Sequence, residues 1–207
     1  LEAVLSAGLA ELERELGELS PTQKAGSTYR SCRDIDVRTA FVERLWWYYR
    51  DKLDQRLEPS MKEVLGAADD LVWACHAQAF AHLPESLPRA APIAYLDSAW
   101  SPRIVPRAEG QPGLAAPDAQ LQKVIADLAL PVISLPRVLV HEPWWLVLLA
   151  HEVGHCIQYD LLDERRLRVE VDKKLRAASG DAAVRWCRWN DEIFADACGV
   201  LLCGSAS

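Results

Sequence analysis

The sequence predicts a mostly α-helical protein of the α+β class with one small sheet. Apolar residues recur at helical spacing through the first eighty positions and again over 143–162 and 185–200. Only two short segments, 92–96 and 131–140, have the composition of strands. Half of the 207 residues are apolar, which is enough to bury one sizeable core.

The first two helices are predicted on either side of a polar loop. Leucines at helical spacing run from Leu1 to Leu19, and Ser20–Ser27 contains the Pro and Gly residues that break the pattern. A second helix is expected from about Asp34 to Leu57. It carries an aromatic cluster that is more typical of helix packing than of ligand binding, namely Trp46, Trp47, Tyr48 and Tyr49.

A third helix is predicted after Pro59. Ser60 and Glu63 have the spacing of a capping box, and the helical pattern continues to about His82. His76 and His82 lie six residues apart and therefore on different faces of that helix, so we expect them to be structural or exposed.

The middle of the chain is predicted to contain two strands and one helix. Prolines recur between Leu83 and Pro117, so this segment is expected to be loop apart from the strand at 92–96. Asp118 is expected to cap a helix that ends near Leu128. The segment 131–140 contains Pro136, which has no N–H to donate, and is therefore expected to be an edge strand able to bind an extended peptide backbone.

The next helix carries the motif His151-Glu152-Val153-Gly154-His155. Pro143 suits the first turn of this helix, expected at 143–162. Two imidazoles four residues apart lie on one helical face and chelate zinc, and the glutamate between them can hold a zinc-bound water. Gly154 costs a helix roughly 1 kcal/mol relative to Ala, so we expect another backbone or a ligand to approach closely there.

A second acidic pair supplies what a site with two histidines lacks. Glu192 and Asp196 lie four residues apart on one predicted helical face. Glu192 would be the third zinc ligand and would leave the fourth position to water, and Asp196 would accept the outward N–H of His151. The small residue Ala195 favours close packing of this helix against the histidine helix. The alternative is a surface ion pair between Glu192 and Arg188.

Together these residues resemble the zincin metallopeptidases, and specifically the gluzincin branch, whose pattern is HExxH followed by ExxxD on a later helix. The resemblance covers about 131–199, and the segment between the two motifs is longer than in thermolysin-like enzymes. The metzincin branch is excluded because Gln158 and Leu161 stand where it has Gly and His. The resemblance implies a helical region at 1–90 and a zincin-like metallopeptidase core, truncated at its C-terminus, at 91–207.

The resemblance also implies a function, that of a zinc-dependent metallopeptidase acting on a peptide or protein substrate. Zinc would be held by His151, His155 and Glu192, with Glu152 as the general base. Three residues are candidates for stabilising the oxyanion: His141, Tyr159 and Arg188. Two alternatives remain open, a catalytically silent interaction module with this fold inside a larger protein and a zinc hydrolase of non-peptide amides.

Composition limits the remaining functional classes. The net charge is −7 and no long basic run occurs, so we expect no nucleic-acid binding. No apolar stretch approaches the roughly 20 residues of a membrane span, which predicts a soluble protein. The six cysteines lack CxxC spacing and are expected to be reduced, which favours the cytoplasm. The chain starts at Leu1 and ends at Ser207 after an apolar helix, so we expect a fragment whose N-terminal helices contact a protein partner.

Overall fold

The computed structural model describes residues 2–18, 25–81, 90–106, 116–128, 130–161, 164–179 and 182–204. These residues form mostly helices with one three-stranded sheet, so the mostly α-helical α+β class is confirmed. The chain divides into two compact units, one of residues 1–51 and 108–129 and one of residues 52–107 and 130–207. The division at residue 90 stays a prediction about the domains. None of the described helices is long and apolar enough to cross a membrane.

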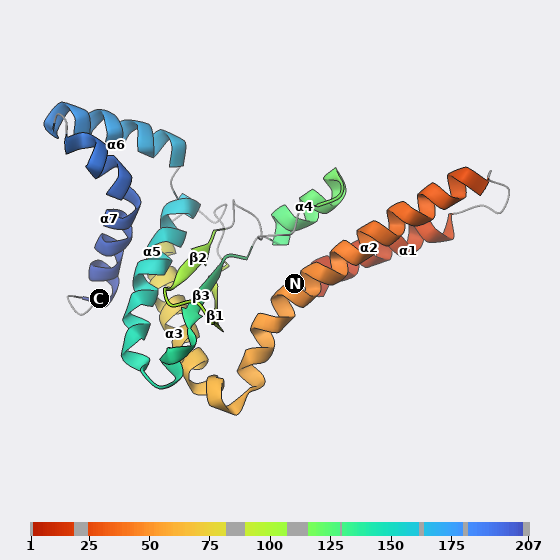
Figure 1. The fold of residues 1–207 in the computed structure, drawn as a ribbon, viewed down its shortest axis with the longest axis horizontal. Helices are drawn as coiled ribbons and strands as arrows, with labels where there is room; N and C mark the ends of the chain where they lie inside the picture. Colours follow the sequence, from red (N-terminus) through yellow and green to blue (C-terminus); the bar gives the residue numbers. More distant parts are fainter. Residues whose placement is uncertain are drawn as a thin grey trace. The chain divides into compact units, whose positions relative to one another are not determined.

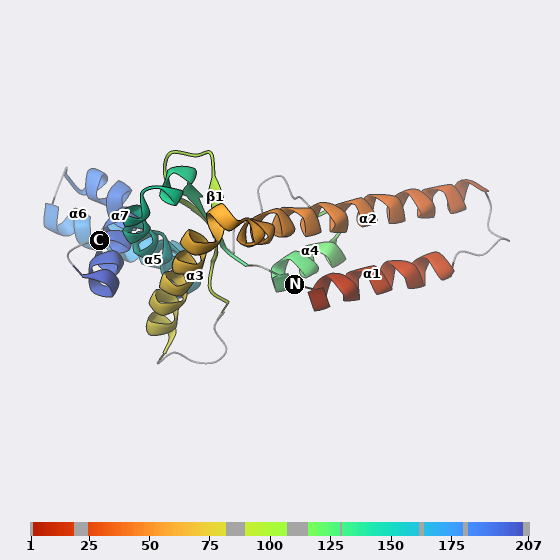
Figure 2. The same ribbon diagram turned by 90° about the horizontal axis from the view of Figure 1, so that it is seen from below.

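The first unit is built from α1 (Glu2–Gly17), most of α2 (Ala25–Asp54) and α4 (Ala119–Leu128). Figures 1 and 2 show α1 and α2 side by side, with the chain running in opposite directions. Arg38 on α2 pairs with Glu15 on α1 and places its Nε 3.0 Å from Asp118. Asp118 also caps α4 as predicted, because its carboxylate accepts the Leu121 backbone N–H at 2.8 Å.

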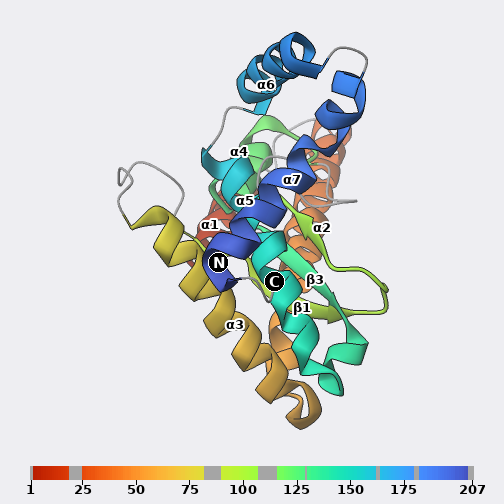
Figure 3. The ribbon, with the colours of Figure 1, turned by 90° about the vertical axis from the view of Figure 1, so that its left-hand side faces the viewer.

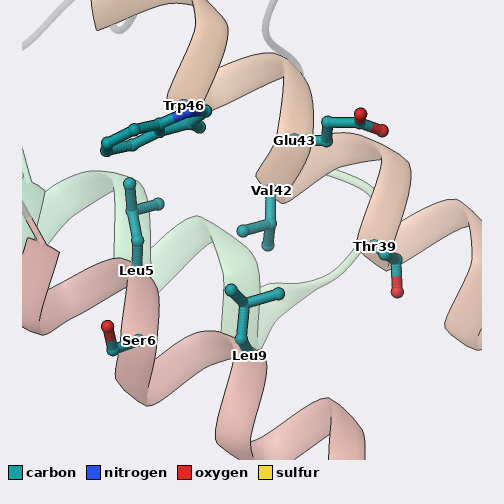
Figure 4. A pocket seen from close by; sticks show the side chains of 7 residues that line it. All are labelled: Leu5, Ser6, Leu9, Thr39, Val42, Glu43 and Trp46. Atoms are coloured by element: carbon teal, nitrogen blue, oxygen red, sulfur yellow. The ribbon is translucent and has the colours of Figure 1, made fainter. Parts of the chain in front are cut away.

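An apolar groove lies between α1 and α2. Figure 4 shows Leu5 and Leu9 of α1 facing Val42 and Trp46 of α2. The pocket that these residues line has a volume of about 550 Å³. Leu9 is 43% exposed and Trp46 is 37% exposed, so the groove leaves apolar surface in contact with solvent. A protein partner for these helices remains a prediction.

The helix boundaries differ from those predicted in the first eighty residues. Within the expected loop Ser20–Ser27, residues 20–24 lie outside the described chain, but α2 already begins at Ala25. The predicted capping box is wrong, because α3 (Pro59–Phe80) has Glu58 as its N-cap and no side-chain cap. Pro59 at the first helical position needs no partner for an N–H, and its fixed φ starts the helix one residue earlier. His82 lies outside the described residues.

The sheet of the second unit has the order β1-β3-β2. β1 (Ile93–Asp97) is parallel to β3 (Val132–Pro136), and β2 (Arg103–Val105) is antiparallel to it. The prediction that 131–140 forms an edge strand is therefore wrong. Pro136 is the last residue of β3, where its missing N–H ends the ladder without forcing the strand to an edge. Residues 137–140 continue as the 3₁₀ helix η3 (Arg137–Val140).

β2 takes an edge position and lies within the segment that was predicted to be loop. Its three residues are flanked by Pro102 and Pro106, so no alternating pattern is long enough to indicate a strand. Backbone pairing with β3 forms it, with Ile104 opposite Ile133. Among the described residues β2 has a strand on one side only.

The helices α3 and α5 (Leu148–Leu161) pack against each other and against the sheet. Alternate residues of the paired strands belong to the same core as these helices, with Ala94 opposite Ile133 and Leu96 opposite Leu135. Burying one face of a three-stranded sheet under two helices gives this unit its hydrophobic core. His76 of α3 is buried and stacked on Phe80, as expected for a structural histidine.

α5 also contacts α7 (Ala183–Cys203), which follows α6 (Glu164–Ser179) in the chain (Figures 1 and 3). A Cβ atom built on Gly154 would lie 2.9 Å from both Cα of Ala195 and Cβ of Cys198. Such distances are too short for non-bonded carbons, so only glycine allows the two backbones to come this close. The expectation that another backbone approaches Gly154 is confirmed.

Substituting Gly154 with Ala is expected to destabilise the fold by about 1–3 kcal/mol, because the added methyl group overpacks the α5–α7 contact. Gly66 on α3 provides a matched control, since it is helical and exposed and an added Cβ meets no atom within 4 Å. Gly66→Ala should stabilise the protein by about 0.5–1 kcal/mol. Urea denaturation measures both changes, and equal responses of the two variants would contradict the close contact.

None of the six cysteines, all of which lie in the described part of the chain, forms a disulfide, and Cys75 and Cys156 are buried. Burial, followed by the neighbouring Cys203 thiol, raises the pKa of Cys75 to about 12. The reactive thiolate of Cys75 is therefore scarce at neutral pH.

We expect Cys75 to resist iodoacetamide at pH 8 in the folded protein and to react at an ordinary thiol rate in urea. An unperturbed thiol has a pKa of about 8.5 and is partly ionised at that pH, whereas the Cys75 thiol is not. Mass spectrometry of peptides after timed labelling measures the rates. Equal rates in both conditions would show that Cys75 is neither buried nor perturbed.

Candidate metal centre

The histidine motif lies in the first two turns of α5. The 3₁₀ helix η4 (Pro143–Val147), with Pro143 in its first turn, leads into α5, so the α-helix begins five residues later than predicted. Every residue from Glu152 to Gln158 is buried. Because α5 is covered along this stretch, the positions of its side chains are set by packing on several sides.

Three potential ligand atoms converge between α5 and α7. The Nε2 atoms of His151 and His155 are 3.1 Å apart. A carboxylate oxygen of Glu192 lies 3.3 Å from Nε2 of His151 and 3.7 Å from Nε2 of His155. Ligands about 2.0–2.1 Å from a tetrahedral zinc ion lie about 3.3 Å from one another. The three residues therefore fit a zinc ion in chemistry and in spacing.

Asp196 completes this arrangement behind His151. Its Oδ1 lies 2.8 Å from Nδ1 of His151. A neutral His151 that donates from Nδ1 keeps its proton on that atom and leaves the Nε2 lone pair directed toward His155 and Glu192. The alternative ion pair with Arg188 does not form, since the ion-pair partners of Glu192 in the described chain are the two histidines.

Burial shifts the pKa of His155 downward. Desolvation is the largest cause and the neighbouring His151 adds to it, against the opposing effect of the carboxylates of Glu192, Asp191 and Asp196. A lowered pKa favours the neutral ring, and only the neutral ring has a lone pair to give to a metal.

Burial shifts the pKa of Glu152 in the opposite direction. Desolvation raises it and the negative charge of Glu192 adds to this, whereas His151 and a hydrogen bond from the Ile104 backbone lower it. The net shift is upward, so Glu152 is a stronger base than an exposed glutamate. Glu152 is 8% exposed and reaches the same cleft as the converging ligand atoms.

The cleft over the motif has a volume of about 330 Å³. Of the three residues predicted to stabilise an oxyanion, only Tyr159 lines it, with its ring centroid 6.5 Å from that of His155. His141 and Arg188 line no part of it. Apart from the predicted ligands and Glu152, the residues at the cleft are Ser101, Pro102, Arg103, Ile104, Tyr159 and Asp191.

The sequence interpretation missed two residues of β2 at this cleft and a contact between α5 and α7 that reaches it through Asp191. Arg103 and Ile104 belong to β2, which was not predicted. Gln158 and Asp191 are joined by a hydrogen bond of 2.9 Å between α5 and α7. The available signal was that Gln158 follows His151 by seven residues and so lies on the same helical face.

Comparison with known proteins adds no assignment. No protein-family model matches the chain, and no curated protein or solved structure is significantly similar to it. The function must therefore be argued from the geometry of the site.

Glu192→Ala is expected to abolish stable zinc binding, because only the two histidines remain as ligands. Asp196→Asn is expected to weaken zinc binding roughly 10- to 100-fold, because an amide orients and polarises the His151 ring less well than a carboxylate. Zinc content and affinity, measured by mass spectrometry and by competition with a chelating dye, check both expectations. Glu170→Gln removes an exposed carboxylate of α6 and is the control. Wild-type affinity in Glu192→Ala would exclude Glu192 as a ligand.

Proposed function

We propose that this protein is a zinc-dependent metallopeptidase of the zincin type. The observation that carries the proposal is the convergence of one ligand atom each from His151, His155 and Glu192, 3.1–3.7 Å from one another, beside a buried glutamate. Zinc, when bound, supplies a Lewis acid that polarises a carbonyl group and lowers the pKa of water.

Glu152 is the proposed general base. Its carboxylate lies in the cleft, and its raised pKa makes it a better proton acceptor near neutral pH than an exposed glutamate. It would accept a proton from the attacking water, hold it on a carboxylate oxygen and deliver it to the leaving amine. A hydrogen bond from the Ile104 backbone N–H would orient this carboxylate.

The position of β2 supports a peptide substrate. β2 is an edge strand of the described sheet and borders the cleft through Arg103 and Ile104. Both backbone groups of a residue in an antiparallel strand face the same side. Since the Ile104 backbone bonds to Glu152, its carbonyl also faces away from β3, where it could accept an N–H of an extended peptide. This interaction would align a peptide bond with Glu152.

Glu152→Gln should retain zinc and lose activity by about 10²- to 10⁴-fold, since the amide cannot accept the proton. The assay incubates the zinc-loaded protein with a diverse peptide library and identifies the cleavage products by mass spectrometry. Glu170→Gln should cleave like the wild type.

The alternative functions predict different results in the same assay. Cleavage of small acylated amines but of no peptide would favour a zinc hydrolase of non-peptide amides. No turnover of either class by the zinc-loaded wild type would contradict the enzyme and favour a catalytically silent interaction module. Unchanged turnover in Glu152→Gln would exclude Glu152 as the base.

A further inference from the structure

We infer that Gln158 is a positioning residue for the metal centre, and that it acts through Asp191 to place the carboxylate of Glu192. The inference rests on the proposed zinc site. It assigns a role to two residues that lie outside the HExxH and ExxxD patterns.

The hydrogen bond between Gln158 and Asp191 is partly buried and joins α5 to α7. Gln158 is 1% exposed, and its side-chain nitrogen donates to the Asp191 carboxylate at 2.9 Å. Burying an amide is unfavourable unless it is hydrogen-bonded. The bond to Asp191 satisfies the side-chain nitrogen of Gln158, whereas its side-chain oxygen is buried with no hydrogen-bond partner among the described residues. Asp191 immediately precedes Glu192 in α7.

Glu192 needs such support because its own side chain is poorly packed. The side chain is 62% exposed, whereas that of His155 is 11% exposed. An exposed glutamate side chain has several accessible rotamers, and fixing it in one costs conformational entropy. The position of its backbone must therefore keep the carboxylate within reach of the histidines.

Three contacts hold α5 against α7 around Glu192. At one end, His151 bonds to Asp196 at 2.8 Å. In the middle, Gly154 lies directly against the α7 backbone. At the other end, Gln158 bonds to Asp191. Of these contacts, the bond between Gln158 and Asp191 lies next to the Glu192 backbone, because Asp191 immediately precedes Glu192 in α7.

The chemistry of Gln158 also suits a zinc site. Its amide donates to Asp191 without adding a positive charge, whereas Lys or Arg at this position would satisfy Asp191 but repel a dication nearby. Because the Gln158 amide is neutral, it does not cancel the negative charges of Asp191 and Glu192, which attract a metal cation. The hydrogen bond between Gln158 and Asp191 therefore positions α7 without weakening the electrostatic attraction of the site for zinc.

The test removes the hydrogen bond between Gln158 and Asp191 and then restores it with the donor and the acceptor exchanged. Gln158→Leu removes the donor, and Gln158→Glu places two carboxylates against each other. In the double variant Gln158→Glu with Asp191→Asn, the amide at position 191 donates and the carboxylate at position 158 accepts. This variant has the same net charge as the wild type. Asp160→Asn, which neutralises a carboxylate two residues further along α5, is the control.

Zinc affinity, the visible spectrum of the cobalt-loaded protein and the unfolding of the metal-free protein are measured for each variant. We expect both single variants to bind zinc roughly 10- to 100-fold more weakly and to show altered cobalt spectra. The double variant should recover affinity and spectrum, and Asp160→Asn should resemble the wild type. The metal-free measurement identifies any variant that has simply failed to fold.

Wild-type zinc affinity and cobalt spectrum in folded Gln158→Leu would overturn the inference while leaving the zinc site intact. Weak binding by the double variant, no better than that of Gln158→Glu, would also overturn it. A wild-type protein that binds neither zinc nor cobalt would instead refute the proposed site, and this inference with it.

Discussion

The close approach of α5 and α7 at Gly154 is the contact on which the candidate site depends. A side chain at this position would push the helices apart, because its first carbon would lie 2.9 Å from the Cα atom of Ala195. The histidines come from α5 and the carboxylates from α7, and a carboxylate on a separate helix reaches an imidazole only when the backbones are close. The hydrogen bonds that His151 and Gln158 of α5 make to the carboxylates of Asp196 and Asp191 on α7 then link the helices on either side of that contact.

Burial shifts the pKa values of Glu152 and His155 in opposite directions. The same desolvation raises the pKa of Glu152 and lowers the pKa of His155, since it disfavours a charge on either group. The raised pKa makes Glu152 a better proton acceptor than an exposed glutamate, and the lowered pKa favours the neutral ring of His155. The side chains of Glu192 and Asp196 are more exposed than that of His151. The side of the site on α5 is therefore tightly packed, and the side on α7 is open to solvent. β2 forms a third side through its backbone.

The sequence predicted the parts of this site that depend on spacing within one helix. His151, Glu152 and His155 belong together because a helical turn brings them together, and the glycine between the histidines indicated a close neighbour. Contacts between distant segments were harder to predict. β2 has too few residues to show a pattern, Pro136 indicated an edge although it only ends β3, and nothing local shows that Gln158 meets Asp191.

The most direct test of the proposed centre is X-ray absorption spectroscopy at the zinc edge of the purified, zinc-loaded protein. The structure brings two imidazole nitrogens and one carboxylate oxygen together, so we expect nitrogen and oxygen scatterers at about 2.0–2.1 Å with the multiple scattering of two histidines, and no sulfur. A sulfur scatterer at about 2.3 Å, or a protein that retains no zinc, would contradict the proposed metal centre.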